Sequence, residues 1–286
     1  MWPVSRNQIK QFLIIPFILI VNNSIFAMVP KAAEDSNSTF LSSLEVYKPI
    51  YFLNTWFFDH EGKDEGYHDR EIHLQFSFKK QVYQAVYFGY SHKAFWQTYD
   101  RENSRPFREQ NYNPEVFLQF SEMEPLDLVR VGIWEHESNG DKQRYDEEGN
   151  EVNYSRTWDR FYLFGEKKLT KHLSLGLKLW IVTSLKTEEY RTFYDDNPDM
   201  QQYMGSGEIY VTIPLAHADF TVMLRRGWRE GTDTIRVDGR VPVLKLLGTE
   251  DSGVDIFFQY FYGYGDSLID YNRCIRRFSL GISFTG

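Results

Sequence analysis

Apolar and polar residues alternate with a period of two in several segments of the chain. Between positions 173 and 181, leucine or isoleucine occupies every odd position, and mostly polar or small residues lie between them. The same alternation recurs over residues 72–78, 209–213 and 278–284. Such a pattern is typical of β-strands that have one apolar and one polar face.

Turn-forming residues separate these segments, as in the polar stretch 195–199 and at Gly231. Antiparallel strands joined alternately by short turns and long polar loops predict an up-and-down β-barrel. A soluble β-sandwich produces the same alternation, so the pattern alone leaves both architectures open.

Aromatic residues are abundant, since 23 Phe, 19 Tyr and 7 Trp make up 17% of the 286 residues. Girdles of aromatic side chains at the two membrane interfaces are one use for so many rings. The mean hydropathy of −0.49 argues against a helical membrane protein. It does not argue against a membrane barrel, in which only alternate residues face lipid. The net charge of −8 argues against a nucleic-acid partner.

The N-terminus has the features of a secretory signal peptide. Arg6 and Lys10 precede an apolar run over residues 12–21, and Ala27 offers a cleavage point. The run is shorter than the about 20 residues that a membrane-spanning helix needs, and a buried core helix is the alternative. We therefore expect a signal peptide over residues 1–27, a polar lead-in over 28–45 and one β-barrel domain over 46–286.

Candidate chemistry lies in the stretch His136-Glu137-Ser138 and in Asp159 on the next expected strand. Residues two positions apart on a strand point to the same face, so the His136 side chain can lean toward the Ser138 hydroxyl. Histidine is the usual base for a serine nucleophile, and a third group must hold its imidazole in the correct tautomer. Asp159 shares the parity of Phe161 and Leu163, which places it on the apolar face.

The spacing His-x-Ser is weak by itself, because most such triplets are solvated strand-end residues. The surrounding sequence adds context. The motifs H-x-S-N-G and S-R-x-W-D-R, together with ordered stretches toward the C-terminus, resemble the outer membrane phospholipase A family. The stretches that carry the resemblance are FWQ at 95–97, SRPFREQNY at 104–112, DDNPD at 195–199, YMG at 203–205 and YGYGDSLIDYN at 262–272.

The resemblance implies a twelve-stranded antiparallel barrel in the bacterial outer membrane, with its active site on the outer wall. It implies calcium-dependent hydrolysis of phospholipid acyl esters at either glycerol position (phospholipase A1 and A2) and of lysophospholipids, by a homodimer. Carried over by position, Ser138 is the nucleophile, His136 is the base and Asp159 orients the imidazole, where the family pattern has Asn.

The same resemblance implies a calcium ion beside the oxyanion of the reaction. By position, its ligands are the backbone carbonyls of Asp141 and Ser155 and the hydroxyl of the partner subunit's Ser104. The backbone N–H groups of Ser138 and Gly140 are the expected oxyanion donors. The loop between the two motifs is longer than in the family pattern, so the register of Asp141 in that loop stays open.

The sequence also allows two other functions. A non-catalytic barrel would act as a pore or a structural protein. Against a pore, cationic side chains paired with the many acidic residues are expected to fill the lumen of a small barrel; they are Arg160, Lys178, Arg226, Arg276 and Arg277. A soluble secreted esterase built on a β-sandwich is the third hypothesis.

Overall fold

The computed structural model describes residues 43–60, 69–101, 104–140, 143–145, 151–183, 197–215, 217–242 and 253–284. The expected signal peptide and most of the expected polar lead-in lie outside the described residues.

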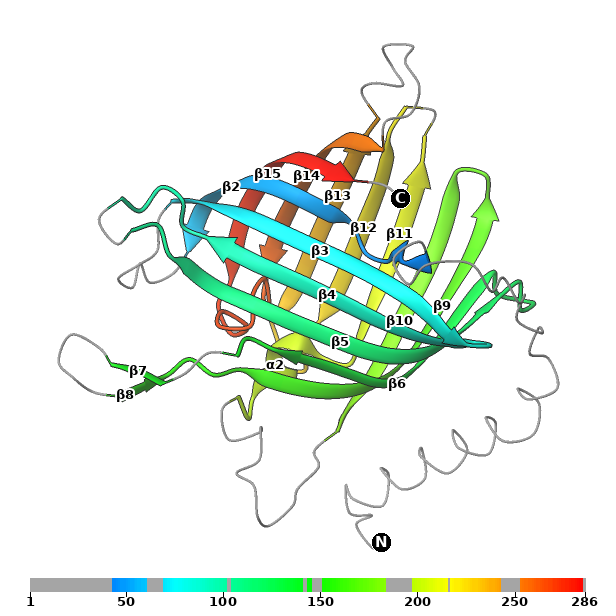
Figure 1. Cartoon of the computed structure of the whole chain (residues 1–286), viewed down its shortest axis with the longest axis horizontal. Helices are drawn as coiled ribbons and strands as arrows, with labels where there is room; N and C mark the ends of the chain where they lie inside the picture. Colours follow the sequence, from blue (N-terminus) through cyan, green and yellow to red (C-terminus); the bar gives the residue numbers. More distant parts are fainter. Residues whose placement is uncertain are drawn as a thin grey trace, which may run out of the picture.

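Twelve strands close into one antiparallel barrel, in agreement with the prediction (Figure 1). In the order in which they neighbour one another, they are β2 (Ile50–His60), β3 (Arg70–Tyr83), β4 (Val86–Trp96), β5 (Phe107–Ser121), β6 (Leu128–Ser138), β9 (Thr157–Thr170), β10 (Leu173–Thr183), β11 (Gly207–Pro214), β12 (Asp219–Arg226), β13 (Asp233–Val241), β14 (Val254–Gly263) and β15 (Ile275–Phe284). The pairing of β15 with β2 closes the sheet.

In the described part of the chain, four short elements lie outside this ring. The strand β1 (Glu45–Val46) pairs with β3 beyond the point where the pairing of β2 with β3 ends. The hairpin of β7 (Gln143–Tyr145) and β8 (Glu151–Asn153) projects beyond β6, and the helix α2 (Met200–Met204) lies between β10 and β11 (Figure 1). Among the described residues, no helix is long and apolar enough to cross a membrane.

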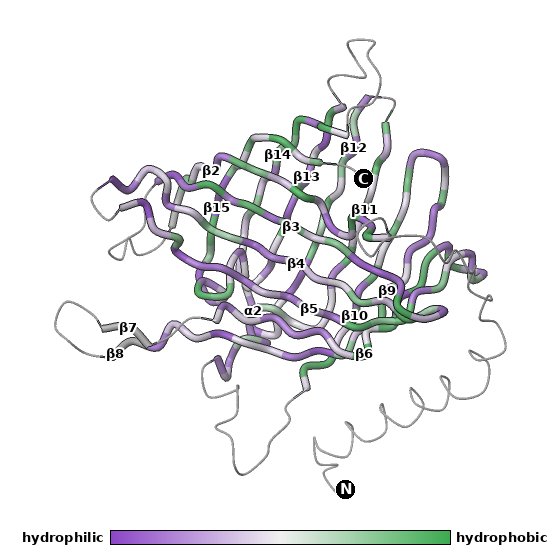
Figure 2. The backbone as a smooth tube through the Cα atoms, viewed as in Figure 1, coloured by the Kyte–Doolittle hydropathy of each residue, from purple (hydrophilic) through white to green (hydrophobic). Residues whose placement is uncertain are grey.

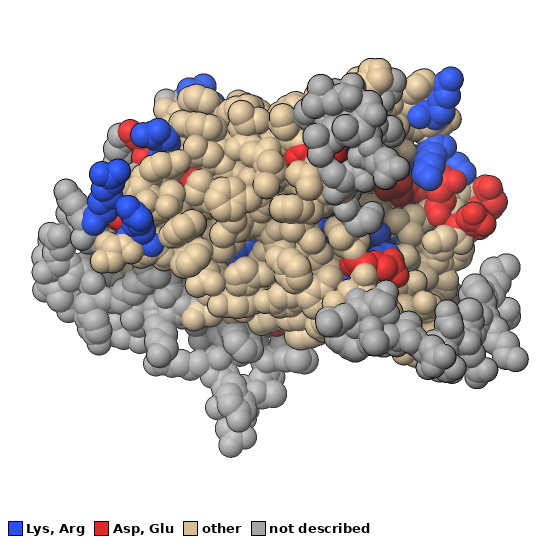
Figure 3. Space-filling model, turned by 45° about the horizontal axis from the view of Figure 1, so that its top comes forward, with Lys and Arg blue, Asp and Glu red and all other residues tan. Residues whose placement is uncertain are grey.

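The apolar face of the strands is the exterior of the barrel. On β10 the exposed fractions of Leu175, Leu177, Leu179 and Ile181 are 40%, 46%, 48% and 53%, whereas Trp180 is buried. The hydropathy along the strands alternates accordingly (Figure 2). Figure 3 shows an outer face whose middle is largely free of charge, with Lys, Arg, Asp and Glu gathered toward opposite ends. This apolar band is that of a membrane barrel, and the soluble β-sandwich alternative is wrong.

The two ends of the barrel differ in their connections. Short turns join β3 to β4 at residues 84–85 and β9 to β10 at 171–172, at the end where β2 begins and β15 ends. Long connections lie at the opposite end, among them residues 139–156 between β6 and β9 and 264–274 between β14 and β15. Membrane barrels of bacteria carry their long loops on the outside of the cell.

Ion pairs fill much of the lumen, as expected. Glu135 pairs with Arg160 and with Lys178, each at 3.0 Å, and Arg277 pairs with Asp266 at 2.6 Å.

The expectation was wrong for Arg226 and Arg276, which lie on the outer surface. Each is adjacent to an inward-facing arginine, Arg225 or Arg277, and neighbouring strand residues point to opposite faces. The side chain of Arg226 is 71% exposed and lies 3.7 Å from Asp233.

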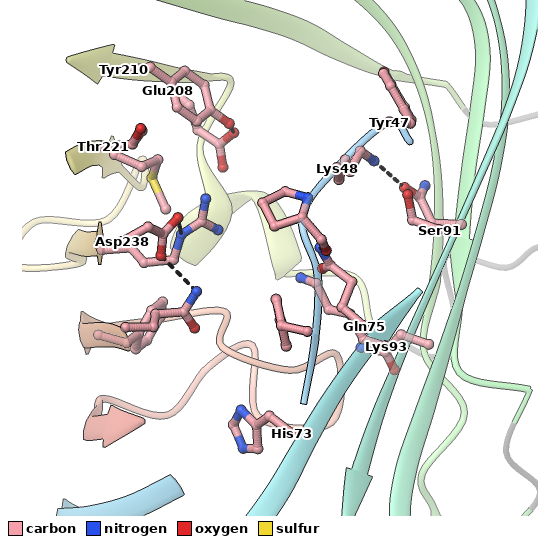
Figure 4. A pocket seen from close by; sticks show the side chains of 18 of the residues that line it. Tyr47, Lys48, His73, Gln75, Ser91, Lys93, Glu208, Tyr210, Thr221 and Asp238 are labelled. Carbon is pink, nitrogen blue, oxygen red and sulfur yellow. Dashed lines mark hydrogen bonds and ion pairs between the residues drawn. The ribbon is translucent and has the colours of Figure 1, made fainter. Parts of the chain in front are cut away.

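A cavity of about 880 Å³ remains inside the barrel (Figure 4). The segment between β1 and β2 directs Tyr47 and Lys48 into it. The Tyr47 ring stacks on Phe117 of β5 with ring centroids 5.3 Å apart, and Phe117 stacks in turn on Tyr87. The Arg130 guanidinium lies 5.1 Å from the centre of the Tyr47 ring. Aromatic and cationic side chains thus cross the lumen near its short-turn end.

Candidate active site

The strands β6 and β9 bring the three predicted site residues together at the long-loop end of the barrel. In the register of this antiparallel pair, His136 lies opposite Asp159 and Ser138 lies opposite Thr157. Alternation along β9 turns Asp159 outward with Phe161 and Leu163, which are 42% and 38% exposed. The predicted outward parity of Asp159 is confirmed.

A β-bulge in β6 explains why the parity around His136 is irregular in the sequence. Gly132 pairs with Tyr162 and Glu135 pairs with Arg160, so Ile133 and Trp134 together oppose one residue of β9. Both are exposed, at 44% and 41%. Before the bulge the odd positions of β6 face outward, and after it the even positions do. The extra residue therefore turns both His136 and Ser138 to the outer wall.

The imidazole of His136 lies between the other two side chains. Its Nδ1 is 3.0 Å from Oδ1 of Asp159, and its Nε2 is 3.0 Å from Oγ of Ser138. The side chains of His136 and Asp159 are 22% and 20% exposed. This is the arrangement of nucleophile, base and orienting carboxylate that can activate a serine hydroxyl.

Trp134 contacts the same carboxylate. Its indole Nε1 donates a hydrogen bond to Oδ1 of Asp159 at 3.0 Å, and its ring stacks on that of His136 with centroids 5.8 Å apart. Trp134 was not among the site residues predicted from the sequence. Its link to Asp159 was missed because it depends on the bulge, which brings Trp134 onto the outer face.

Two asparagines support the backbone around the site from the loop side. Asn197 accepts a hydrogen bond from the Thr157 N–H at 2.9 Å and donates one to the Thr157 carbonyl at 3.0 Å. Asn139 accepts from the Arg156 N–H and donates to the Tyr154 carbonyl. Both asparagines are buried, at 4% and 5% exposed. Polar groups of the long loops thus fix the end of β6 and the start of β9.

The predicted oxyanion donors lie at the end of β6. Gly140 has a φ of +61°, and a Cβ at this position would lie 3.2 Å from the ring of Tyr112. Both the backbone conformation and the nearby ring therefore favour glycine here.

The predicted calcium ligands are only partly within the described residues. Asp141 lies outside them. The carbonyls of Ser155 and Asn153 both accept from Nη1 of Arg156, at 2.7 and 3.0 Å. Ser104 lies on a different loop, between β4 and β5, and is exposed. In the described part of the chain, no group of three or more His, Cys, Asp or Glu residues could hold a metal ion.

The loop between β14 and β15 packs beside this region. Tyr271 donates a hydrogen bond to Asp199, and the Arg156 guanidinium lies 5.8 Å from the centre of its ring. Burial raises the pKa of the Tyr271 hydroxyl, and the bond to the Asp199 carboxylate raises it further. Tyr271 therefore stays a neutral donor through the physiological pH range.

Comparison with known proteins agrees with this geometry. Residues 29–284 match the family described as Phospholipase A1. The phospholipase A1 of Salmonella typhimurium is 30% identical over 195 residues, which cover 68% of this chain and 60% of that protein. The match thus spans less than two thirds of the relative's length.

Solved structures resemble the whole barrel. Outer membrane phospholipase A from Escherichia coli has a TM-score of 0.70 and 27% identity, and the match covers 85% of this chain and 98% of that one. A Salmonella typhi outer membrane phospholipase, a dimer with bound calcium, has a TM-score of 0.69 and 26% identity over 88% and 94% of the two chains. The chain therefore belongs to the phospholipase A1 family and is a multi-pass β-barrel protein of the bacterial outer membrane.

Proposed function

We propose that this protein is a calcium-dependent phospholipase that hydrolyses acyl esters of membrane phospholipids. The observation that carries the proposal is the placement of His136 between Ser138 and Asp159, within 3.0 Å of each, on the apolar exterior of the barrel. A serine site that opens to the lipid phase meets the ester groups of phospholipids directly. Cleavage at either glycerol position and of lysophospholipids belongs to the same proposal.

In the proposed reaction, Oγ of Ser138 attacks the ester carbonyl while Nε2 of His136 takes its proton. The carboxylate of Asp159 holds the Nδ1–H of His136 and stabilises the imidazolium that forms. The backbone N–H groups of Ser138 and Gly140 would donate to the oxyanion. His136 then protonates the leaving alcohol oxygen, and in the second half it activates the water that releases the fatty acid.

The loop before β9 fits a calcium ion by the chemistry of its donors. The carbonyls of Asn153 and Ser155 are turned toward one cationic group, the Arg156 guanidinium. Carbonyl and hydroxyl oxygens are ligands that Ca²⁺ prefers. We assign the ion to the carbonyls of Ser155 and Asp141 and the hydroxyl of the partner subunit's Ser104. When bound, it would supply positive charge beside the oxyanion. The Salmonella typhi relative, a dimer with bound calcium, supports both the ion and a homodimer.

Covalent labelling combined with chelation tests the proposal. A sulfonyl fluoride carried by a lipid-like chain should modify Ser138 of the purified protein in detergent, and fatty-acid release should fall in parallel with labelling. A calcium chelator should abolish release, and added Ca²⁺ should restore it. Labelling of other residues while Ser138 stays unmodified, in protein that loses activity, would refute the assignment of the nucleophile.

A further inference from the structure

A proline interrupts the sheet next to the candidate base. Pro114 lies in the middle of β5, which is hydrogen-bonded to β4 on one side and β6 on the other. Proline has no backbone N–H to contribute to a ladder, so it is rare in strands that are paired on both sides. The registers Tyr112 to Ser138 and Glu115 to Glu135 place Pro114 directly opposite His136.

The Pro114 nitrogen, which carries no hydrogen, lies on the side of the His136 carbonyl. The Asn139 N–H donates to the Arg156 carbonyl, so the backbone groups of Asn139 point toward the β9 side. Backbone groups of successive residues in an antiparallel sheet point alternately to the two neighbouring strands. Those of His136 therefore point toward β5, where Pro114 has no hydrogen to offer.

The side chain of the preceding residue supplies the donor instead. Nδ2 of Asn113 donates a hydrogen bond to the His136 carbonyl at 2.8 Å. Asn113 faces the lumen and is 7% exposed. Its Oδ1 accepts from Nζ of Lys48 at 2.9 Å. Figure 4 shows Lys48 extending from the segment before β2 toward the part of the barrel wall where Ser91 of β4 is labelled.

Lys48 fixes which way the amide of Asn113 faces. A lysine ammonium group has donors and no acceptor, so it holds the amide oxygen on its own side. The NH₂ group must then face the His136 carbonyl. Lys48 is held in turn by Glu115, whose Oε1 lies 3.1 Å from Nζ.

We propose that Asn113 is a positioning residue for the base, replacing the backbone donor that Pro114 lacks and oriented by Lys48 from inside the barrel. This inference rests on the proposed role of His136. The β6 strand is irregular here, since the bulge at Ile133 lies just before His136. Without the Asn113 amide, the His136 carbonyl loses the hydrogen bond donated to it at 2.8 Å, and the imidazole shifts relative to Ser138.

The test compares three variants in a phospholipid hydrolysis assay. Asn113→Asp keeps the acceptor for Lys48 and removes the donor, and we expect kcat to fall about tenfold with KM nearly unchanged, because small misplacements of a reacting group are costly. Asn111→Asp is the matched control. Asn111 lies on the same face of β5, is 3% exposed, and its Oδ1 has no hydrogen-bond partner among the described residues. It should keep a kcat close to that of the wild type.

A second substitution that restores kcat would distinguish a positioning role of Asn113 from a general structural role. Pro114→Val restores a backbone N–H opposite His136, so the double variant Asn113→Asp/Pro114→Val should regain most of the lost kcat. Unfolding in urea, followed by tryptophan fluorescence, should show all variants folded. A wild-type kcat in Asn113→Asp, or a double variant no more active than Asn113→Asp, would overturn the inference. An inactive wild type would instead refute the proposed function itself.

Discussion

At the scale of single residues, Trp134 and His136 both contact the Asp159 carboxylate, and this shared contact determines which atom position 159 must present. The indole N–H is only a donor, and it donates to the same oxygen that lies 3.0 Å from Nδ1 of His136. Whatever side chain stands at position 159 must therefore present an oxygen here. Trp134 thereby allows an aspartate or an asparagine to hold the same imidazole tautomer.

This leads to a prediction for position 159. Asp159→Asn should keep kcat within about tenfold of the wild type, whereas Asp159→Ala should lower it by about 10²-fold or more, since the tautomer is no longer held. The double variant Trp134→Phe/Asp159→Asn should lose much more of its kcat than Asp159→Asn alone, because the Asn amide can then turn its NH₂ group toward His136. Initial rates of fatty-acid release measure all three. Equal losses for Asn and Ala would contradict this account.

The residue-scale geometry could be predicted only in part. The period of two placed Asp159 outward correctly, and the His-x-Ser spacing placed the two side chains on one face. The bulge at Ile133 could not be predicted, because an extra residue in a strand changes parity without a marked change in composition. The role of Trp134 was missed for the same reason. The roles assigned to the predicted site residues stay predictions.

At the scale of elements, the loops of the long-loop end fix the start of β9. Asn197 lies in the segment before α2, far from β9 in sequence, yet it makes both an accepting and a donating bond to Thr157. Thr157 is two residues before Asp159 on the same strand. The loop that carries Asn197 therefore helps to position the part of β9 that carries Asp159.

Removing the hydrogen bonds of Asn197 to Thr157 should destabilise the fold. Asn197→Ala leaves two buried backbone groups of Thr157 without their partner, which we expect to lower the free energy of unfolding by about 2–3 kcal/mol. The activity should fall as well. Asn197→Asp keeps the acceptor for the Thr157 N–H and should lose less. Urea denaturation midpoints check the order, and an Asn197→Ala variant as stable as the wild type would rule out this role for the loop.

A second loop gives a pH-dependent prediction. Burial alone would raise the pKa of Asp266, but Arg277 at 2.6 Å outweighs it and holds the pKa below its ordinary value. A carboxylate whose pKa is lower in the folded than in the unfolded protein stabilises the fold. This stabilisation is complete at a pH above the pKa of the unfolded state, and it is lost as the pH falls through the pKa of the folded state. The difference in Tm between wild type and Asp266→Asn should therefore have its largest value at pH 7 and decrease below about pH 4. A difference independent of pH would contradict it.

At the scale of the whole molecule, the exterior and the lumen have opposite characters. The exterior strand residues are apolar, while ion pairs such as Glu135 with Arg160 fill the interior, and Tyr47 and Lys48 reach into it. The strands with one apolar face could be predicted from the alternation, and the barrel from the alternation together with the signal peptide, the aromatic content and the family resemblance. Which cations enter the lumen could not be read from composition, because Arg225 and Arg226 differ only in parity.

Aromatic and cationic side chains cross the lumen, so we predict that the protein does not conduct like a porin. Purified protein in planar bilayers should give no stepwise conductance increments of the size that a water-filled barrel produces. A porin of known conductance in the same bilayer is the control. Regular large increments from the wild-type protein would favour the pore alternative.

The central claim is that Ser138, activated by His136 on the outer wall, hydrolyses phospholipids. The most direct measurement is fatty-acid release from phospholipid by purified wild-type protein and by Ser138→Ala, in detergent with Ca²⁺. We predict release by the wild type and a loss of at least about 10³-fold in a Ser138→Ala variant that unfolds at the same urea concentration. Equal release by the folded variant would contradict the account.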